Sequence, residues 1–315
     1  MRFGYLYLKK RIQRILPSDI QQVDTADDVD VWLQHNIKGK NYEEQVSIDK
    51  IRESRKPFIV IENPTFRQIG LRKGHGHYYR FSWNSYTRDD GEYNNKDCPP
   101  DRWNKIKKDL NIDIKDWSRA DDGYILFILQ KPGDSALMKI AWEGGEYSAE
   151  KYFRYLNSVL REIRKYTDRK IRIRLHPIHP VFIQQQVDLI NRLQIDGLEI
   201  SSNYDGVYAR EGWGGTGLYE DFAGAFAVVG MSSNTLTESV CEGIPTWSTC
   251  PSCMAWEVSN HDLSRIEDDI VEFDRTQWLH NLAYTQWEKK EIRSRKPINH
   301  LMKCYEGVKK RYGWI

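Results

Sequence analysis

The sequence has little cysteine, and it has no apolar run long enough to cross a membrane. The five cysteines of the 315-residue chain are odd in number and scattered, which excludes a disulfide framework and is typical of a reducing cytosol. A membrane-spanning helix needs about 20 mostly apolar residues in a row, and no segment approaches that length. The apolar patch near the start, MRFGYLYLKKRIQR, is too short for a signal peptide. We therefore expect a cytoplasmic protein with no membrane partner.

The chain also lacks a strong excess of either charge. Lys and Arg total 47 against 45 for Asp and Glu, so the net charge alone gives no case for a nucleic-acid partner. Basic residues are interleaved with aromatic ones at 67–80, and such segments suit a polyanion or a sugar equally well. Internal repeats and low-complexity tracts are absent from the sequence. The length and the 40% hydrophobic content predict two globular domains.

Strand and helix patterns alternate from residue 120 onward. Short apolar runs predict buried strands, and apolar residues at three- and four-residue spacing predict amphipathic helices between them. The expected strands are 124–130, 170–175, 198–200 and 226–229, and the expected helices are 148–166, 181–194 and 218–225. Strands that alternate with helices of this length form a parallel sheet covered on both faces. The sequence therefore predicts an α/β, Rossmann-like domain in this half.

The N-terminal half has a weaker pattern. FIVIE at 58–62 predicts a strand, and 29–33 is a second candidate. The segment 64–117 is long, polar and aromatic and has no clear periodicity, which is typical of functional or mobile stretches. The tail from Asp274 onward is expected to be helical and basic.

The strongest local signal for a binding site is the pair Ser232 and Ser233, which precedes an expected helix. Ligands of doubly wound sheets gather at the carboxyl ends of the strands, and a helix that starts there offers free N–H groups to a phosphate. Ser233, Asn234 or Thr235 can equally serve as the helix cap, and the two roles are compatible. Glu238, one turn further on, is placed to reach ribose hydroxyls.

A second signal is the stretch Arg174-Leu-His176-Pro177 at the end of another expected strand. The proline stops the strand and fixes the chain, so the imidazole projects into the strand-end crevice. A histidine there can donate to a diphosphate or to a leaving phosphate, although it can also be a histidine satisfied within a turn. Because both signals fall at the same end of one sheet, together they are more specific than either alone.

The third signal is acidic. Asp89-Asp90-Gly91-Glu92 lies in the aromatic segment of the N-terminal half. An inverting sugar transfer needs a carboxylate or a histidine to take a proton from the acceptor hydroxyl. The same letters also form an ordinary turn, and a second copy at 121–123 is interpreted only as a turn.

The sequence gives little support for a metal site. His75, His77, Cys250 and Cys253 form a zinc set only if distant segments are combined, and a lone CxxC is a weak motif. A DxD-type motif at a strand end is also missing. We therefore expect no cofactor and no essential metal.

Taken together, the motifs Asp89-Asp90-Gly91, His176-Pro177 and Ser232-Ser233 resemble those of the bacterial capsule-type sialyl- and Kdo-transferases. The C-terminal 190 residues or so also look like glycosyltransferase-like proteins encoded by bacteriophages, some of which attach a sugar to 5-hydroxymethyl pyrimidines in DNA. The resemblance implies two Rossmann-like domains of the GT-B type and a metal-independent reaction. It also implies a host-cytoplasm location if a phage encodes the chain.

This resemblance assigns roles to the motifs. Residues 1–143 form an acceptor domain, 144–285 a donor domain, and 286–315 a helical tail that returns to the first domain. Asp90 is the expected general base, with Asp89 or Glu92 as its substitute. The nucleotide-sugar donor is held by Arg174, His176, Ser232, Ser233, Asn234, Thr235 and Glu238.

The preferred acceptor at this stage is hydroxymethylated DNA. An extruded base has to stack on aromatic side chains, and basic residues have to contact phosphates. The expected contacts are Arg67, Arg72, Lys73, Tyr79, Arg80, Trp83 and Tyr86. Two alternatives stay open, which are a saccharide acceptor, as in capsule synthesis, and a nucleotide-sugar-binding module without catalysis.

Overall fold

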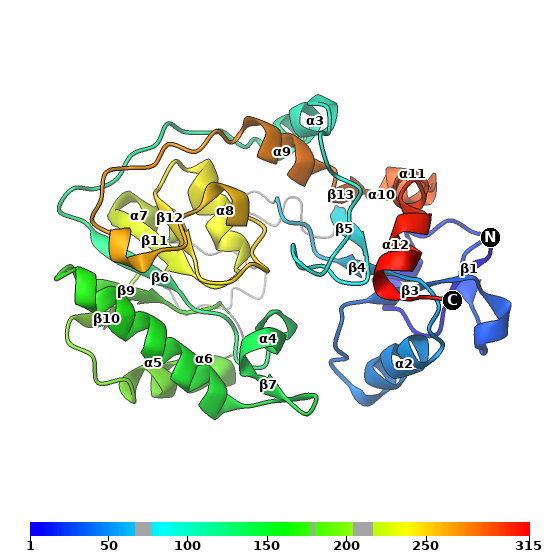
Figure 1. Ribbon diagram of the computed structural model, residues 1–315, viewed down its shortest axis with the longest axis horizontal. Helices are drawn as coiled ribbons and strands as arrows, with labels where there is room; N and C mark the ends of the chain where they lie inside the picture. The colour runs from blue at the N-terminus through cyan, green and yellow to red at the C-terminus, as the bar shows by residue number, and fades with distance from the viewer. Residues whose placement is uncertain (67–76, 178–179, 204–216) are drawn as a thin grey trace. The chain divides into compact units, whose positions relative to one another are not determined.

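The chain forms two compact units, which are described separately (Figure 1). A computed structural model of the protein describes residues 1–66, 77–177, 180–203 and 217–315. Among these residues, unit 1 comprises 1–66, 77–110 and 276–315, and unit 2 comprises the remainder between 111 and 275. Each unit is built on its own sheet, so the α/β class with two Rossmann-like units is confirmed.

Unit 1 contains a sheet with the strand order β13-β5-β4-β3-β1-β2. The strands are β1 (Phe3–Tyr5), β2 (Gln21–Gln22), β3 (Val31–His35), β4 (Phe58–Glu62), β5 (Tyr78–Trp83) and β13 (Gln286–Glu288). The first four are parallel to one another, whereas β5 is antiparallel to both β4 and β13. The sheet is therefore a parallel half with an antiparallel strand beside it.

Helices cover both faces of this sheet. The helices of unit 1 are α1 (Lys10–Gln13), α2 (Tyr42–Glu53), α3 (Asp101–Leu110), α9 (Thr276–Ala283), α10 (Lys289–Arg293), α11 (Lys296–Met302) and α12 (Tyr305–Tyr312). Alternation along β3 and β4 sends Leu33 and Ile61 to the side of the C-terminal helices and Trp32 to the side of α2. The two cores explain why these strands read as continuous apolar runs.

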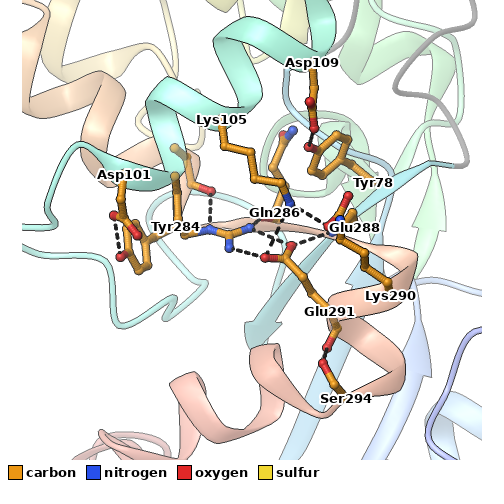
Figure 2. A network of polar contacts seen from close by, with 12 residues as sticks. Tyr78, Asp101, Lys105, Asp109, Tyr284, Gln286, Glu288, Lys290, Glu291 and Ser294 are labelled. Atoms are coloured by element: carbon orange, nitrogen blue, oxygen red, sulfur yellow. Dashed lines mark hydrogen bonds and ion pairs between the residues drawn. The ribbon is translucent and has the colours of Figure 1, made fainter.

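A buried polar network fastens the C-terminal segment to α3 within unit 1 (Figure 2). The Arg102 guanidinium donates to Glu291 at 2.8 and 3.2 Å and lies 3.7 Å from the ring centre of Trp287. Lys105 pairs with Glu288 at 2.6 Å. Glu291 is buried, and burial by itself raises the pKa of a carboxyl. The neighbouring charge of Arg102 opposes that effect, and the pKa of Glu291 is lowered.

Unit 2 contains a sheet with the order β10-β9-β6-β11-β12, in which every pairing is parallel. Its strands are β6 (Tyr124–Ile128), β9 (Ile171–Arg174), β10 (Leu198–Ile200), β11 (Ala225–Gly230) and β12 (Thr246–Ser248), with the small hairpin β7 (Trp142–Glu143) and β8 (Glu146–Tyr147) outside it. Its helices are α4 (Met138–Ala141), α5 (Ala149–Tyr166), α6 (Pro180–Asn191), α7 (Leu218–Ala223) and α8 (Asn234–Cys241). One core joins this sheet to α5 and α6.

Most expected elements of unit 2 are present within one or two residues of their expected bounds. Ser148 caps α5 by accepting the Lys151 N–H at 3.2 Å, as the sequence predicts. The division of the chain differs from the expected boundary after residue 143. β6 lies in the centre of the second sheet, so the first crossing between the units falls near residue 110. In the described ranges, no helix is long and apolar enough to span a bilayer.

Candidate functional site

Three strands of unit 2 end at the same level, and this places the two C-terminal motifs side by side. Ile128 of β6 pairs with Arg174 of β9 and with Gly230 of β11. Two residues beyond these partners come Gln130, His176 and Ser232. Adjacent strands lie about 4.8 Å apart, so His176 and Ser232 flank Gln130 across a width of roughly 10 Å. The predicted donor-site motifs therefore meet at one edge of the sheet.

The serine pair has the geometry of a helix N-terminus that is open to solvent. Ser233 is the N-cap of α8, and its hydroxyl accepts the Thr235 N–H at 3.2 Å. Ser232, Ser233, Asn234 and Thr235 are half-buried, whereas the rest of α8 from Leu236 to Cys241 is buried. The capping interpretation is correct, and it leaves the positive end of the helix dipole facing the strand edge.

Gln130 is a site residue that sequence reasoning missed. Its side-chain amide donates to the Ser232 hydroxyl at 3.2 Å, so it links the ends of β6 and β11. Its backbone is fixed by Tyr152 of α5, whose hydroxyl accepts the Gln130 N–H at 3.1 Å and donates to the Gln130 carbonyl at 2.9 Å. Burial raises the pKa of Tyr152 well above its ordinary value, so this hydroxyl keeps its proton. The only sequence signal was its place just after a strand.

His176 is positioned through its backbone by a second glutamine that the sequence did not indicate. The fully buried Gln186 of α6 accepts the His176 N–H at 2.7 Å and donates to the His176 carbonyl at 3.1 Å. The same amide donates to the Phe182 carbonyl at 3.1 Å. The chain at His176 is therefore held on both sides by one side chain. Pro177 then turns the chain out of the sheet.

Arg174, which was predicted to bind the donor, has a buried acidic partner. It pairs with Asp221 of α7 and donates to the Gly217 carbonyl at 3.2 Å. Asp221 also accepts from Ser201 at 2.7 Å and from Asn203 at 2.9 Å. The guanidinium thus ties β9 to α7, which is a structural role, and its contact with a donor stays a prediction. Glu238 is buried on α8, and its contact with ribose likewise stays a prediction.

The acidic motif of unit 1 forms a tight turn after β5. The Asp90 carbonyl accepts from Asn84 at 3.0 Å and from the Tyr312 hydroxyl at 2.7 Å. A Cβ on Gly91 would lie 2.4 Å from the Ser85 carbonyl oxygen, so only glycine fits there. Both the turn interpretation and the glycine requirement hold at this position.

The charges of the carboxylates in this turn act on two different tyrosines. The charges of Glu92 and Asp90 act on Tyr312 of α12, and Glu92 also pairs with Arg311 at 3.4 Å. The charge of Asp89 acts instead on the buried Tyr93, as does Glu62 at the carboxyl end of β4. Burial raises the pKa of Tyr93, the charge of Arg80 lowers it, and the two carboxylates raise it. Asp89 and the strand-end residue Glu62 therefore act on the same buried tyrosine.

Four of the predicted acceptor-binding residues belong to the core of unit 1. Trp83 is fully buried and donates to the Leu301 carbonyl at 3.0 Å, and Arg80 donates to the Asn63 carbonyl at 2.9 Å. A buried ring cannot stack on a base unless the core opens, so the structure gives no support to DNA contact by this group, which stays a prediction. The four residues are Tyr79, Arg80, Trp83 and Tyr86. The others lie outside the described residues and are Arg67, Arg72 and Lys73.

Metal-ligating side chains do not gather in the part of the chain that the structure describes. No group of three or more His, Cys, Asp or Glu residues there is arranged to hold an ion. Cys250 and Cys253 are both buried. Metal independence remains a prediction of the sequence.

Comparison with solved structures identifies proteins of similar fold. The chain is similar to the β-Kdo 2,4-transferase of KpsC from Thermosulfurimonas dismutans, with a TM-score of 0.53 and 13% identity over 90% of each chain. It is also similar to the β-Kdo 2,7-transferase of the same organism's KpsC, with a TM-score of 0.51 and 11% identity over 95% of this chain and 99% of that one. No protein-family model and no curated protein sequence matches the chain. The likeness shows the fold that these transferases share with the chain.

Proposed function

We propose that the chain is a glycosyltransferase that moves a sugar from a nucleotide-sugar donor to a hydroxyl group of a saccharide acceptor. The observation that carries the proposal is the level ending of three parallel strands, which gathers His176, Gln130 and the serine pair at one edge. The fold shared with two Kdo transferases supports the same reaction class. A chain with this fold and this strand edge is suited to bind a nucleotide sugar by its phosphates.

The donor phosphates would lie against the N-terminus of α8. The N–H groups that α8 leaves unused and the hydroxyls of Ser232 and Ser233 are donors, and the helix dipole adds positive potential. His176 would donate to a phosphate oxygen from the neighbouring side of the edge. As the bond between the anomeric carbon and the phosphate oxygen breaks, negative charge grows on that oxygen. Donors fixed in advance stabilise such charge without reorganising.

The acceptor hydroxyl has to lose its proton as its oxygen attacks the anomeric carbon. Asp90 was the first candidate for this base, with Asp89 and Glu92 as substitutes. The charges of unit 1 favour Asp89, because Glu92 pairs with Arg311 and acts together with Asp90 on Tyr312, whereas Asp89 acts on Tyr93 together with the strand-end residue Glu62. We therefore assign the proton transfer to Asp89.

A saccharide is preferred over DNA as the acceptor. The described residues that were expected to stack on an extruded base are buried. The similar structures are transferases of Kdo, which is a sugar. Hydroxymethylated DNA is retained as an arm of the experiment.

The experiment has a binding step and a transfer step. UDP-, GDP-, TDP- and CMP-sugars are first screened by thermal shift, since a ligand at a hundred times its dissociation constant adds about 2.7 kcal/mol of stability. The donor that binds is then offered with capsule-type oligosaccharides and with hydroxymethylated duplex DNA. We expect the oligosaccharides to be extended. If the DNA is labelled and no oligosaccharide is extended, the acceptor is hydroxymethylated DNA and not a saccharide.

His176→Ala tests the placement of the donor. A hydrogen bond to a charged group is worth roughly 1.5–3 kcal/mol, so turnover should fall by about 10- to 150-fold while the protein stays folded. His261→Ala, which removes an exposed histidine elsewhere in unit 2, is the control and should leave turnover unchanged. Full activity of a folded His176→Ala protein would show that the donor does not bind at this edge of the sheet.

A further inference from the structure

A second strand end, in unit 1, holds a histidine with unused hydrogen-bonding capacity. His35 is the last residue of β3 and is 6% exposed. Neither ring nitrogen has a hydrogen-bond partner among the described residues. A buried polar group without a partner costs free energy, typically about 1–3 kcal/mol. Such a group in a native fold calls for an explanation beyond packing.

Positive charge surrounds this histidine. After burial, which is the larger cause, the charges of Lys9, Arg11 and Lys40 lower the pKa of His35 to about 3 from an ordinary 6.5. Glu44 opposes them, but it already pairs with Lys9 at 3.3 Å and accepts the Lys40 N–H at 2.9 Å. Three cations and one carboxylate leave a net positive site, so the neutral ring lies where an anion would be stabilised.

Two of these cations are unengaged. The side chains of Arg11 and Lys40 are exposed and form no ion pair or hydrogen bond with any residue that the structure describes. They come from different segments, since Arg11 lies in α1 after β1 and Lys40 precedes α2. The parallel pairing of β1 with β3 brings both segments to the same edge of the sheet. The fold thus brings Arg11 and Lys40 to the carboxyl end of β3.

An exposed aromatic residue follows Lys40 closely in the sequence. Tyr42, the first residue of α2, is 83% exposed, although large apolar side chains are usually covered. It follows Lys40 by two residues, and Asn41 between them caps the helix by accepting the Glu44 N–H at 2.8 Å. An aromatic ring next to cations is suited to a sugar that carries a negative charge.

We propose that the His35 cluster, defined here as the buried His35 with Lys9, Arg11, Lys40 and Tyr42, binds the carboxylate of an acidic sugar in the acceptor through its exposed cations. This inference rests on the proposed function and specifies its acceptor as an acidic saccharide. Arg11 and Lys40 neutralise the carboxylate, and Tyr42 covers the sugar ring. The cluster centres on the carboxyl end of one strand, which suits a single carboxylate better than the spaced phosphates of a duplex.

The binding test uses two probes that differ only in the carboxylate, methyl glucuronoside and methyl glucoside. Affinities are measured by NMR titration of the full chain. Arg11→Gln/Lys40→Gln should weaken binding of the glucuronoside by about tenfold or more, since charge-assisted hydrogen bonds are the strong ones. Lys50→Gln, at the other end of α2, is the matched control and should leave affinity unchanged. Equal binding of both probes to the wild type, or an equal loss in the control, would overturn the proposal.

The ring of His35 reports on the site directly. An anion bound among the cations raises the pKa of His35, and nitrogen-15 spectra of the histidines follow that change. The glucuronoside should raise it and the glucoside should not; an unchanged pKa under saturating glucuronoside contradicts the assignment. Tighter competition by duplex DNA than by the glucuronoside would assign the cluster to phosphates instead. Nucleotide-sugar binding is measured on the same samples, so a failure of the proposed function appears there and not in the saccharide arms.

Discussion

The two sheets of the molecule differ in how far apart in the sequence their strands lie. Four of the five strands in the unit 2 sheet follow one another with a helix between neighbours, and all its pairings are parallel. The unit 1 sheet takes β13 from residues 286–288 and pairs it with β5, more than 200 residues earlier. Alternating strand and helix patterns reveal the first kind of sheet but not the second. Local periodicity therefore predicts the sheet of unit 2, to which we assign the donor, and misses part of the sheet of unit 1.

The largest expected effect concerns the proposed general base in unit 1, the unit with the weaker sequence pattern. Asp89→Asn should lower turnover by about 10²- to 10⁴-fold, the usual contribution of a positioned general base, and should leave nucleotide-sugar binding intact. Calorimetry with the donor and turnover with the acceptor measure the two quantities. Asp90→Asn is the matched control. If Asp90→Asn loses activity and Asp89→Asn does not, the earlier assignment of the base to Asp90 is restored.

The next effect tests whether β13 is held in place by the buried ion pair between Arg102 and Glu291. Arg102→Met removes the buried partner of Glu291 and leaves only Lys105, at 3.6 Å, to offset its charge, so the free energy of unfolding should fall by about 3 kcal/mol. Denaturant unfolding measures the change. Arg265→Met removes an exposed pair with Asp268 and should leave stability almost unchanged, because water screens that pair. Similar values for the two variants would mean that this network does not secure β13.

Unit 1 should also be the part that is sensitive to acid. Burial, followed by the charge of Lys303, lowers the pKa of His300 to about 4, against 6.5 for an ordinary histidine. The unfolded chain therefore binds more protons than the folded one, and stability is lost as the pH falls from about 6.5 towards 4. His300→Gln should flatten that dependence in denaturant unfolding measured across this range. A slope identical to that of the wild type would show that His300 does not contribute.

The smallest effect separates capping from binding within unit 2. Ser233 and Ser148 each cap a helix by accepting an N–H at 3.2 Å. Either serine replaced by alanine should cost about 1 kcal/mol of stability. Only Ser233→Ala should also weaken nucleotide-sugar binding, which a thermal-shift titration detects. Loss of binding in both variants would indicate a stability effect alone.

The sequence by itself determined much of unit 2. The apolar runs set β6, β9, β10 and β11, the spacing of apolar residues set α5, and Ser148 and Ser233 were identifiable as caps. These features depend on neighbours within a few residues, so the local pattern contains the information. The two-domain α/β class follows from the same patterns.

Only the tertiary structure decided how the site is assembled. The register of β6, β9 and β11 brings His176 and Ser232 to either side of Gln130, and registers are not written in local spacing. Tyr152 and Gln186 hold the edge from helices whose facing residues the sequence did not specify. The aromatic segment 64–117 was interpreted as functional or mobile because it has no clear periodicity, yet its residues 78–83 form the buried strand β5, which lies between β4 and β13. Contacts between residues hundreds of positions apart made that choice.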